Sequence, residues 1–289
     1  MPAWVGRHAA AVEPANPFTF PPGKAVGVTA GIGRITIQTF SHIGDLSILA
    51  FQVARALVRD RQRRSVVLTQ LYHIGYLSLP VVLIFGMFLG LVMAVQCYVT
   101  LVKFRAEVMC GPMINYSLVS QLAPAFTALI FAGRVGSNLA AELGTMQITE
   151  QINALRVMGT NPIAHLVAPR VLASVLLLPL LTALASLVGI IAAAVMCIGI
   201  WQVDAGGYWF QSMKFVTTWD ILCGLAKTFF FGAIIALVSC RQGLATQGGA
   251  TGVGQSVTRA VVEASLLVMV VNFVLTLVFN KLWALTHVA

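Results

Sequence analysis

Five long apolar stretches constrain the fold of this chain more than any other feature. They cover 77–99, 114–132, 171–200, 219–238 and 260–283, and a helix needs about 20 apolar residues to cross a bilayer. Of all residues, 58% are hydrophobic and 9% are charged, whereas about 25% are charged in a typical soluble domain. The sequence therefore predicts an all-α integral membrane protein with five transmembrane helices. The third stretch is long enough to contain a re-entrant bend.

The positions of lysine and arginine predict the orientation of these helices, because cytoplasmic loops carry an excess of both. With a cytoplasmic N-terminus, thirteen of them lie inside: eight before the first stretch, three between 134 and 170, and Arg241 and Arg259. The other five are Lys103, Arg105, Lys214, Lys227 and Lys281. We therefore expect the N-terminus on the cytoplasmic side and the C-terminus on the outer side.

Two segments precede the membrane domain, which we place at 65–289. Residues 1–39 have a Pro- and Ala-rich start and are expected to be a disordered extension. In "FSHIGDLSILAFQVARALVRDRQRR" (40–64), Phe40, Ile43, Leu46, Val53 and Leu57 recur at roughly helical spacing before a cluster of arginines. This pattern predicts an amphipathic helix in the inner-leaflet interface, and the alternative is a plain basic flank of the first span.

A short polar stretch, "ELGTMQITEQINALRVMGTNP" (142–162), separates the second and third apolar stretches. Ile148, Ile152 and Leu155 form an apolar stripe opposite Glu150, and the helix-ending residue Gly159 follows. This pattern predicts one polar-faced cytoplasmic helix over about 142–158.

Motifs for catalysis and for cofactors are missing. The chain has no G-x-x-x-x-G-K-[ST] loop, and we interpret "GGATGVG" (248–254) as a flexible cytoplasmic turn. The histidines are scattered, the five cysteines contain no C-x-x-C pair, and Ser137 lacks a G-x-S-x-G context. The basic residues lie between apolar runs, which does not favour nucleic acid. We therefore expect no catalytic residue, no cofactor and no metal site.

Polar side chains inside the apolar stretches are the candidates for function, because burying them in lipid is costly. Lys227 lies about eight residues into the fourth stretch, where it either faces a polar cavity or snorkels outward. Gln121 and Asn272 lie in the second and fifth stretches and either bind a ligand or join two helices by a hydrogen bond.

Three segments resemble the MlaE (YrbE) family of ABC-transporter permeases. The longest is "AGRVGSNLAAELGTMQITEQINALRVMGTNPIAHLVAPRVLA" (132–173), and the others are "QLYHIGYLSLPVV" (70–82) and "GVGQSVTRAVVEASLLVMVVNFVLT" (252–276). The resemblance covers about residues 40–283. It implies a permease subunit in the bacterial inner membrane that forms a dimer and moves lipid, in particular phospholipid, between that membrane and the envelope.

The resemblance also implies partners. A separate cytoplasmic ABC ATPase would bind the ATP, an MCE-domain lipid-binding protein would act on the outer side, and a STAS-domain protein would bind inside in some systems. The helix over 142–158 would then be a coupling helix that docks into the ATPase. Its candidate contact residues are Glu142, Thr149, Glu150, Gln151, Arg156 and Met158.

The chain departs from the family at two places where relatives carry charges. It has "SQLAP" (120–124) where many members have Arg-Glu-Leu-Gly-Pro, and Asn272-Phe273 in place of an Asp-Phe pair, whereas Lys227 matches a family lysine. We expect lipid to meet an apolar wall with a few polar groups near the outer mouth. The candidates are Leu77, Leu83, Met87, Leu91, Val95, Phe104, Arg105, Gln121, Lys227 and Asn272.

Two other classes of membrane protein fit this sequence less well. An ion- or proton-coupled secondary transporter would have acids or histidines along the spans and inverted repeats. The interior acids are nearly absent and no repeat is visible. A membrane-embedded lipid enzyme would need a nucleophile or a metal cluster, and neither is visible in the sequence.

Overall fold

The computed structural model describes residues 44–57 and 64–287, and in these ranges every regular element is a helix. The predicted extension 1–39 and the arginines at 59, 61 and 63 lie outside the described residues. Residues 45–289 form one compact unit. The all-α class predicted from the sequence is confirmed.

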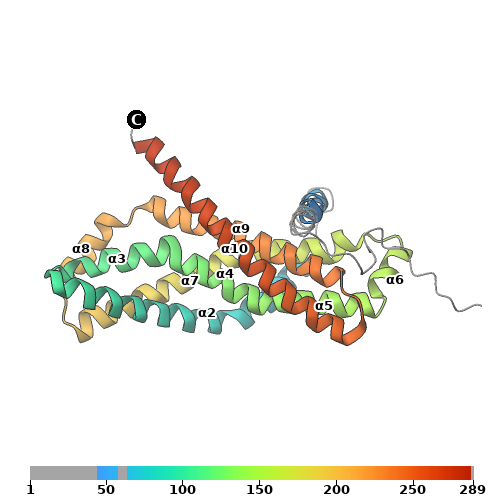
Figure 1. The fold of residues 1–289 in the computed structure, drawn as a ribbon, viewed down its shortest axis with the longest axis horizontal. Coiled ribbons are helices and arrows are strands. Elements are labelled where there is room, and N and C mark those ends of the chain that lie inside the picture. Colours follow the sequence, from blue (N-terminus) through green and yellow to red (C-terminus); the bar gives the residue numbers. More distant parts are fainter. Residues whose placement is uncertain (1–43, 58–63, 288–289) are drawn as a thin grey trace, which may run out of the picture. The chain divides into compact units, whose positions relative to one another are not determined.

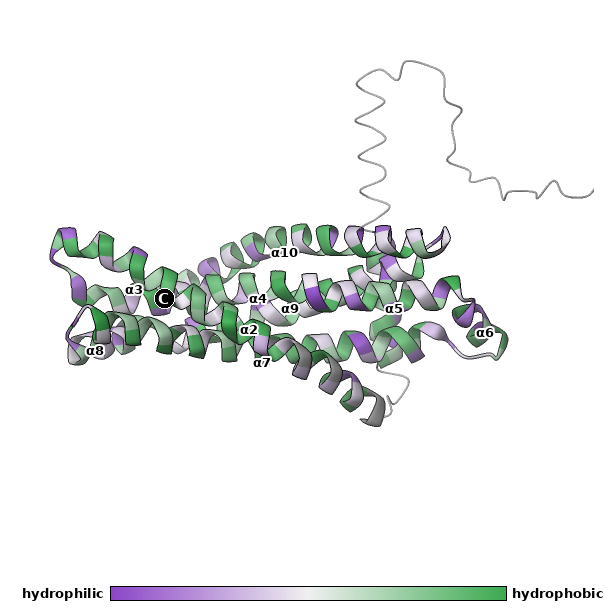
Figure 2. Cartoon of the chain, turned by 90° about the horizontal axis from the view of Figure 1, so that it is seen from below, coloured by the Kyte–Doolittle hydropathy of each residue, from purple (hydrophilic) through white to green (hydrophobic). Residues whose placement is uncertain are grey.

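Five helical segments are long and apolar enough to cross a membrane, as predicted. They are Ser78–Phe104, Glu107–Ile148, Ile163–Ile200, Thr218–Leu244 and Gly249–Leu285. Figure 1 shows them as long helices, and Figure 2 shows that hydrophobic residues predominate along them. The chain is therefore a multi-pass membrane protein.

The described residues contain nine labelled α-helices. These are α2 (Arg64–Leu101), α3 (Cys110–Ser117), α4 (Ala123–Phe131), α5 (Ser137–Ile148), α6 (Gln151–Val157), α7 (Ala168–Ala194), α8 (Ala205–Phe215), α9 (Thr218–Leu244) and α10 (Gly249–His287). Of these, α6 and α8 lie between spans. Short 3-10 turns, η1 (Val102–Phe104) and η2 (Glu107–Met109), connect α2 to α3. A further helix covers 44–57.

Single π-helical turns join the pieces of the second and third spans. In the second, η3 (Leu118–Leu122) and η4 (Ala132–Gly136) connect α3, α4 and α5. In the third, η5 (Ile163–Val167) and η6 (Val195–Ile200) flank α7, so this span runs through without the re-entrant bend that its length allowed. Such turns are rare in proteins, and those that occur are often found at functional sites.

Small residues bring α2 and α7 into backbone contact. Gly86 and Gly90 on α2 face Ala185 and Gly189 on α7, and a Cβ added at Gly90 would lie 2.0 Å from the Gly189 carbonyl oxygen. Both pairs are four residues apart, which is the spacing that lets helices approach closely in membranes. Apolar helices in lipid lack a hydrophobic drive to associate, so this close van der Waals contact stabilises the pair.

Two local predictions were wrong. The single helix predicted over 142–158 is two helices, because Glu150 adopts a left-handed conformation (φ 59°) between α5 and α6. The glycine-rich segment 248–254 is not a flexible turn: Gly248 and Gly249 have positive φ, and α10 begins at Gly249.

In the helix over 44–57, the side chains of Leu49, Val53 and Ala56 belong to the main buried cluster, and Leu46 and Leu57 pack against that cluster. Ile48 and Phe51 are exposed on its other side. Arg241 of α9 forms ion pairs with Asp45 of this helix and with Glu263 of α10. That the helix over 44–57 lies in the lipid interface stays a prediction.

Candidate functional site

Lys227 is the most deeply buried cation of the described residues. It lies in α9 and is 2% exposed. Its Nζ donates hydrogen bonds to the Ser120 carbonyl oxygen at 3.1 Å, to Gln121 Oε1 at 3.2 Å and to Thr276 Oγ1 at 3.0 Å. An ammonium has three N–H donors and no acceptor, so all three donors have a partner. The side chain is held between helices and does not snorkel outward.

The local sequence explains why these groups meet. Gly224 lies one turn before Lys227, and a Cβ there would be 2.3 Å from the Val119 carbonyl oxygen, so only glycine lets α9 approach η3 this closely. On the other side, Pro124 has no N–H, and the Ser120 carbonyl therefore lacks its α-helical donor. The Lys227 ammonium donates a hydrogen bond to this carbonyl.

All three oxygens around the Lys227 ammonium are neutral. Their hydrogen bonds satisfy its donors, yet none of them compensates its charge. An uncompensated buried charge costs several kcal/mol, and hydrogen bonds to neutral oxygens recover only part of that. The arrangement therefore favours any mobile anion that can reach the ammonium.

A cavity of about 210 Å³ opens beside this ammonium. It is lined by Tyr116, Ser120, Gln121, Phe215, Thr217, Trp219, Asp220, Cys223, Lys227, Thr276, Phe279, Asn280 and Trp283. These residues come from the second span, the end of α8, α9 and α10. We call this cavity the Lys227 pocket.

The structure brings only part of the predicted lipid site together. Gln121 accepts from Lys227 and from the Thr276 hydroxyl, and both Gln121 and Lys227 line the pocket. Asn272 lies one turn before Thr276, and its carbonyl oxygen accepts from the Thr276 hydroxyl. Asn272 Oδ1 is buried without a hydrogen-bond partner, and the residue does not line the pocket.

The remaining lipid candidates lie elsewhere. Phe104 and Arg105 are exposed at the end of the first span, and neither lines the Lys227 pocket. Four apolar candidates lie on α2 with partly or fully exposed side chains and do not line it either: Leu83, Met87, Leu91 and Val95. The side chain of Leu77 lies outside the described part of the structure. The predicted proximity of Phe104 and Arg105 to Lys227 is thus not seen within one chain.

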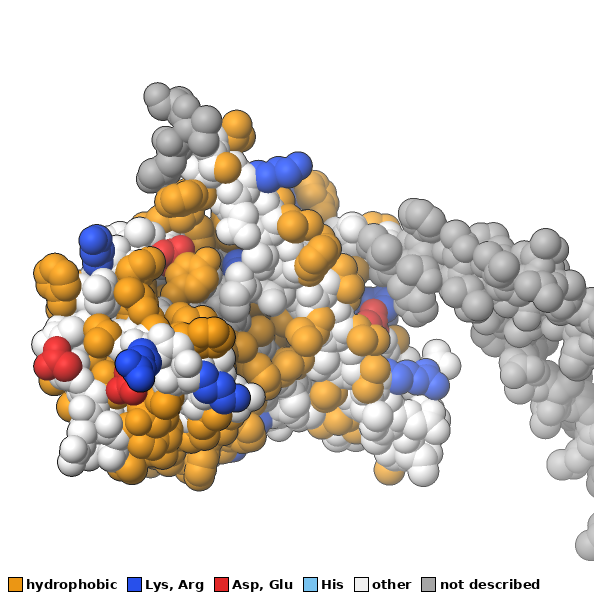
Figure 3. All heavy atoms as spheres, turned by 60° about the vertical axis from the view of Figure 1, so that its left-hand side comes forward, with side chains coloured by type: hydrophobic (Ala, Val, Ile, Leu, Met, Phe, Trp, Pro, Cys, Tyr) orange, Lys and Arg blue, Asp and Glu red, His pale blue; other side chains and the backbone are white. Residues whose placement is uncertain are grey.

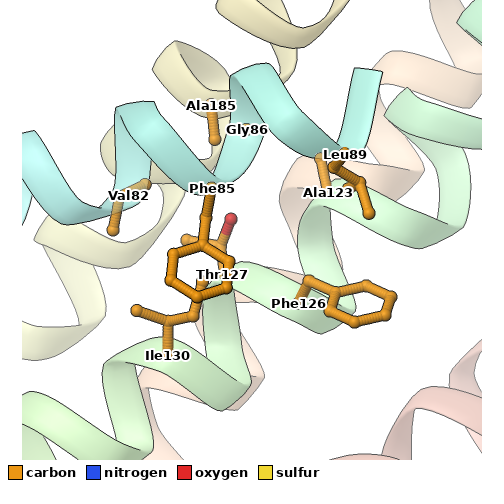
Figure 4. A pocket seen from close by; sticks show the side chains of 9 residues that line it. All are labelled: Val82, Phe85, Gly86, Leu89, Ala123, Phe126, Thr127, Ile130 and Ala185. Atoms are coloured by element: carbon orange, nitrogen blue, oxygen red, sulfur yellow. The ribbon is translucent and has the colours of Figure 1, made fainter. Parts of the chain in front are cut away.

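A second cavity lies between α2, α4 and α7, and Figure 4 shows its lining. Phe85, Phe126 and Ile130 extend into this region, and Thr127 contributes its one hydroxyl. The volume is about 20 Å³, which holds about one water molecule. This cavity cannot hold a lipid headgroup.

The coupling candidates divide between two environments. Glu142 forms an ion pair with the buried Arg170 of α7 at 3.0 Å and accepts from Asn138, so it ties α5 to α7 and does not face a partner freely. The others lie at the end of α5 or around α6, where their residues are exposed: Thr149, Glu150, Gln151, Arg156 and Met158.

Contacts within α6 order its polar face. Asn153 donates to Glu150, and Arg156 donates to Asn153 Oδ1. Ile152 is fully buried, whereas Val157 and Met158 are 89% and 69% exposed. Val157 was not among the predicted contact residues, although an apolar residue two positions before the helix-ending Gly159 is a signal for an exposed tip.

Several residues of the Lys227 pocket were also missed. Thr276 and the Ser120 carbonyl hold the ammonium, and Asp220, Trp219 and Trp283 line the same cavity. A signal was present, because Asp220 and Lys227 are seven residues apart and so are Thr276 and Trp283. Residues seven apart lie on the same face of a helix.

The chain matches a model of one protein family, described as permease MlaE, over residues 67–278. It is 33% identical over 252 residues to the intermembrane phospholipid transport system permease protein MlaE of Haemophilus influenzae, which covers 87% of this chain and 97% of that protein. It is 39% identical over 237 residues to a probable ABC transporter permease protein of Synechocystis, covering 82% and 90%. It is 34% identical over 256 residues to one of Rickettsia conorii, covering 88% and 98%.

The substitution Gln121→Glu tests whether the Lys227 charge is uncompensated. A carboxylate in place of the amide oxygen would make a charge-assisted hydrogen bond, which should raise the stability of the purified protein by roughly 1–2 kcal/mol. Thermal unfolding in detergent measures this gain. In a Lys227→Met background the same substitution should lower the melting temperature, because the new carboxylate has no cation. An equal shift in both backgrounds would contradict the prediction.

Proposed function

This chain belongs to the MlaE permease family, and on that premise we propose that it is the transmembrane permease subunit of an ATP-binding-cassette lipid transporter. Its substrate would be phospholipid, moved between the inner membrane and the envelope. The observation that carries the proposal is the family match, which extends over 67–278 and so covers most of the described spans. The relative in Haemophilus influenzae is named as a phospholipid transport permease, and the match to this chain covers nearly its whole length.

The Lys227 pocket supports a lipid substrate. A phospholipid carries a phosphate anion between apolar chains and a headgroup, and the pocket joins a buried ammonium to aromatic side chains inside the membrane-spanning part of the chain. A phosphate can take over one of the ammonium's hydrogen bonds, such as that of the Thr276 hydroxyl. It would bring the charge compensation that the neutral oxygens lack.

The permease would be a non-catalytic subunit that depends on partners. A separate cytoplasmic ATPase would bind and hydrolyse ATP, and an MCE-domain protein would exchange lipid on the outer side. A STAS-domain protein is a further candidate partner. A second permease copy would complete the membrane part, which is consistent with the large exposed apolar surface of α10, including Leu266, Phe273 and Leu277.

We place the N-terminus in the cytoplasm and the C-terminus on the outer side, on the basis of the Lys and Arg distribution. The loop with α6 and the segment with α8 lie at opposite ends of the helices (Figures 1 and 2). In this orientation α6 faces the ATPase. The Lys227 pocket, lined by the end of α8 and the first turns of α9, lies in the outer half of the membrane.

Lipid retention tests the substrate assignment. The permease complex purified from membranes should contain bound phospholipid, and Lys227→Ala should lower the amount several-fold, because the phosphate loses its cation. Lys227→Arg should keep most of it. Lys281→Ala is the matched control, since Lys281 is an exposed lysine of α10 that does not line the pocket. Mass spectrometry of extracted lipid gives the amounts, and equal lipid in all four proteins would refute the assignment.

Charge reversal at Glu150 tests the coupling role of α6. Glu150→Lys puts a cation on the exposed connection between α5 and α6, so it should weaken ATPase binding or uncouple hydrolysis from lipid, with the permease still folded. Glu107→Lys, at the other end of the second span, should leave both properties unchanged. The measurements are ATPase pull-down and lipid-stimulated hydrolysis. Parent-like values of both for Glu150→Lys would remove the coupling assignment.

Cysteine labelling tests the orientation. In a background without reactive native cysteines, Gly206→Cys should react with an impermeant thiol reagent added from outside, and Thr160→Cys should react only after the membrane is permeabilised. Both positions are exposed, so accessibility reports the side of the membrane. The reverse labelling pattern would invert the topology.

A further inference from the structure

The Lys227 pocket is lined by a second charged residue, Asp220, which is not among the hydrogen-bond partners of Lys227. Because α9 and α10 are successive helices joined by the short connection 245–248, they run in opposite directions, and the hydrogen bond from Lys227 to Thr276 fixes their register. Seven residues toward the start of α9 lies Asp220, and seven residues toward the end of α10 lies Trp283. Seven residues make about two turns, or roughly 10 Å. Both residues line the same pocket as Lys227.

Asp220 contributes an anion at this end. Its Oδ2 accepts from the backbone N–H and the hydroxyl of Thr217 at the start of α9, so the carboxylate is fixed in place by a capping box. These bonds use one oxygen, and a carboxylate has a second oxygen with free acceptor capacity. Among the described residues that line the pocket, Asp220 is the one acid and Lys227 the one base.

Aromatic side chains provide further surface for a cation. Tyr116, Phe215, Trp219, Phe279 and Trp283 line the pocket. Trp219 is adjacent to Asp220 in the chain, and Trp283 lies at the same level by the register above. Aromatic faces attract organic cations, and tryptophan does so most strongly. Figure 3 shows the molecule with the end that carries α3 and α8 turned forward, where acidic and basic side chains lie among many hydrophobic ones.

We propose that this pocket recognises a zwitterionic phospholipid headgroup. The phosphate would lie at Lys227, and the ammonium of a choline or ethanolamine group would lie between Asp220 and the two tryptophans. A headgroup of this class carries its cation a few bonds from its phosphate, so one molecule can meet both ends of the pocket. An anionic headgroup without a cation would meet Lys227 favourably and Asp220 unfavourably.

This inference rests on the proposed function, and it adds the class of lipid. Tryptophans near the end of a span also occur simply as membrane-interface anchors. An anchor would stabilise the helix in the bilayer, and it would not discriminate between lipids that differ only in their headgroups. Headgroup discrimination therefore separates the two roles.

The test is a competition between lipids with identical acyl chains. The permease complex is equilibrated with vesicles that contain equal amounts of phosphatidylcholine, phosphatidylethanolamine and phosphatidylglycerol, then purified, and its bound lipid is quantified by mass spectrometry. The two zwitterionic lipids should be enriched over phosphatidylglycerol by roughly two- to fivefold, as expected from cation–π and carboxylate contacts.

Variants assign the enrichment to the pocket. Asp220→Asn keeps an oxygen that can accept the capping bonds and removes the charge, so it should abolish the enrichment. Asp204→Asn is the matched control, because Asp204 caps α8 through the Gly207 N–H and does not line the pocket. Trp283→Leu should lower the share of phosphatidylcholine. Trp201→Leu should not, because the Trp201 ring stacks on Tyr98 and does not line the pocket.

A soluble arm distinguishes a headgroup from a free phosphate. Glycerophosphocholine should displace bound lipid at lower concentration than inorganic phosphate does. Equal displacement by both, or equal retention of the three lipids with no effect of Asp220→Asn, would overturn the inference and leave lipid transport standing. Absence of any bound lipid in the parent complex would instead overturn the proposed function itself.

Discussion

A lysine ammonium buried inside a membrane span, among neutral oxygens, is the constraint on which this site depends. Lys227 has three hydrogen-bond acceptors and no carboxylate among them. The hydrogen bonds stabilise the ammonium in the helix bundle, but no carboxylate is among its hydrogen-bond partners, so its charge is not compensated locally. A phosphate-bearing ligand would supply the missing negative charge.

The helix packing around this lysine follows from a few residues with particular backbone properties. Gly224 lets α9 touch η3, and Pro124 frees the Ser120 carbonyl for the ammonium. The contact between α2 and α7 likewise depends on small residues, Gly86, Gly90 and Gly189. In lipid, where apolar surface gives little drive for association, close backbone contact and interhelical hydrogen bonds determine which helices meet. The pocket is thus a consequence of how these helices can pack.

The sequence predicted the five spans because their length and apolarity leave few alternatives, and it predicted a special role for Lys227 because a cation at that depth is costly. It could not predict which face of α2 meets protein, since lipid and the bundle interior are both apolar and the pattern of Leu83, Met87 and Leu91 suits either. The break at Glu150 was missed because a left-handed residue is rarely visible in composition. That Asp220 and Trp283 line one pocket depends on the register of α9 and α10, which the hydrogen bond between Lys227 and Thr276 fixes in three dimensions.

A high-resolution cryo-electron microscopy map of the permease complex, extracted together with its native lipids, would show whether a ligand phosphate compensates the charge of Lys227. We expect phosphate density within hydrogen-bond distance of Lys227 Nζ, in the cavity between η3, α9 and α10. A map in which the headgroup density lies elsewhere, with only water or acyl chain beside the Lys227 ammonium, would contradict it.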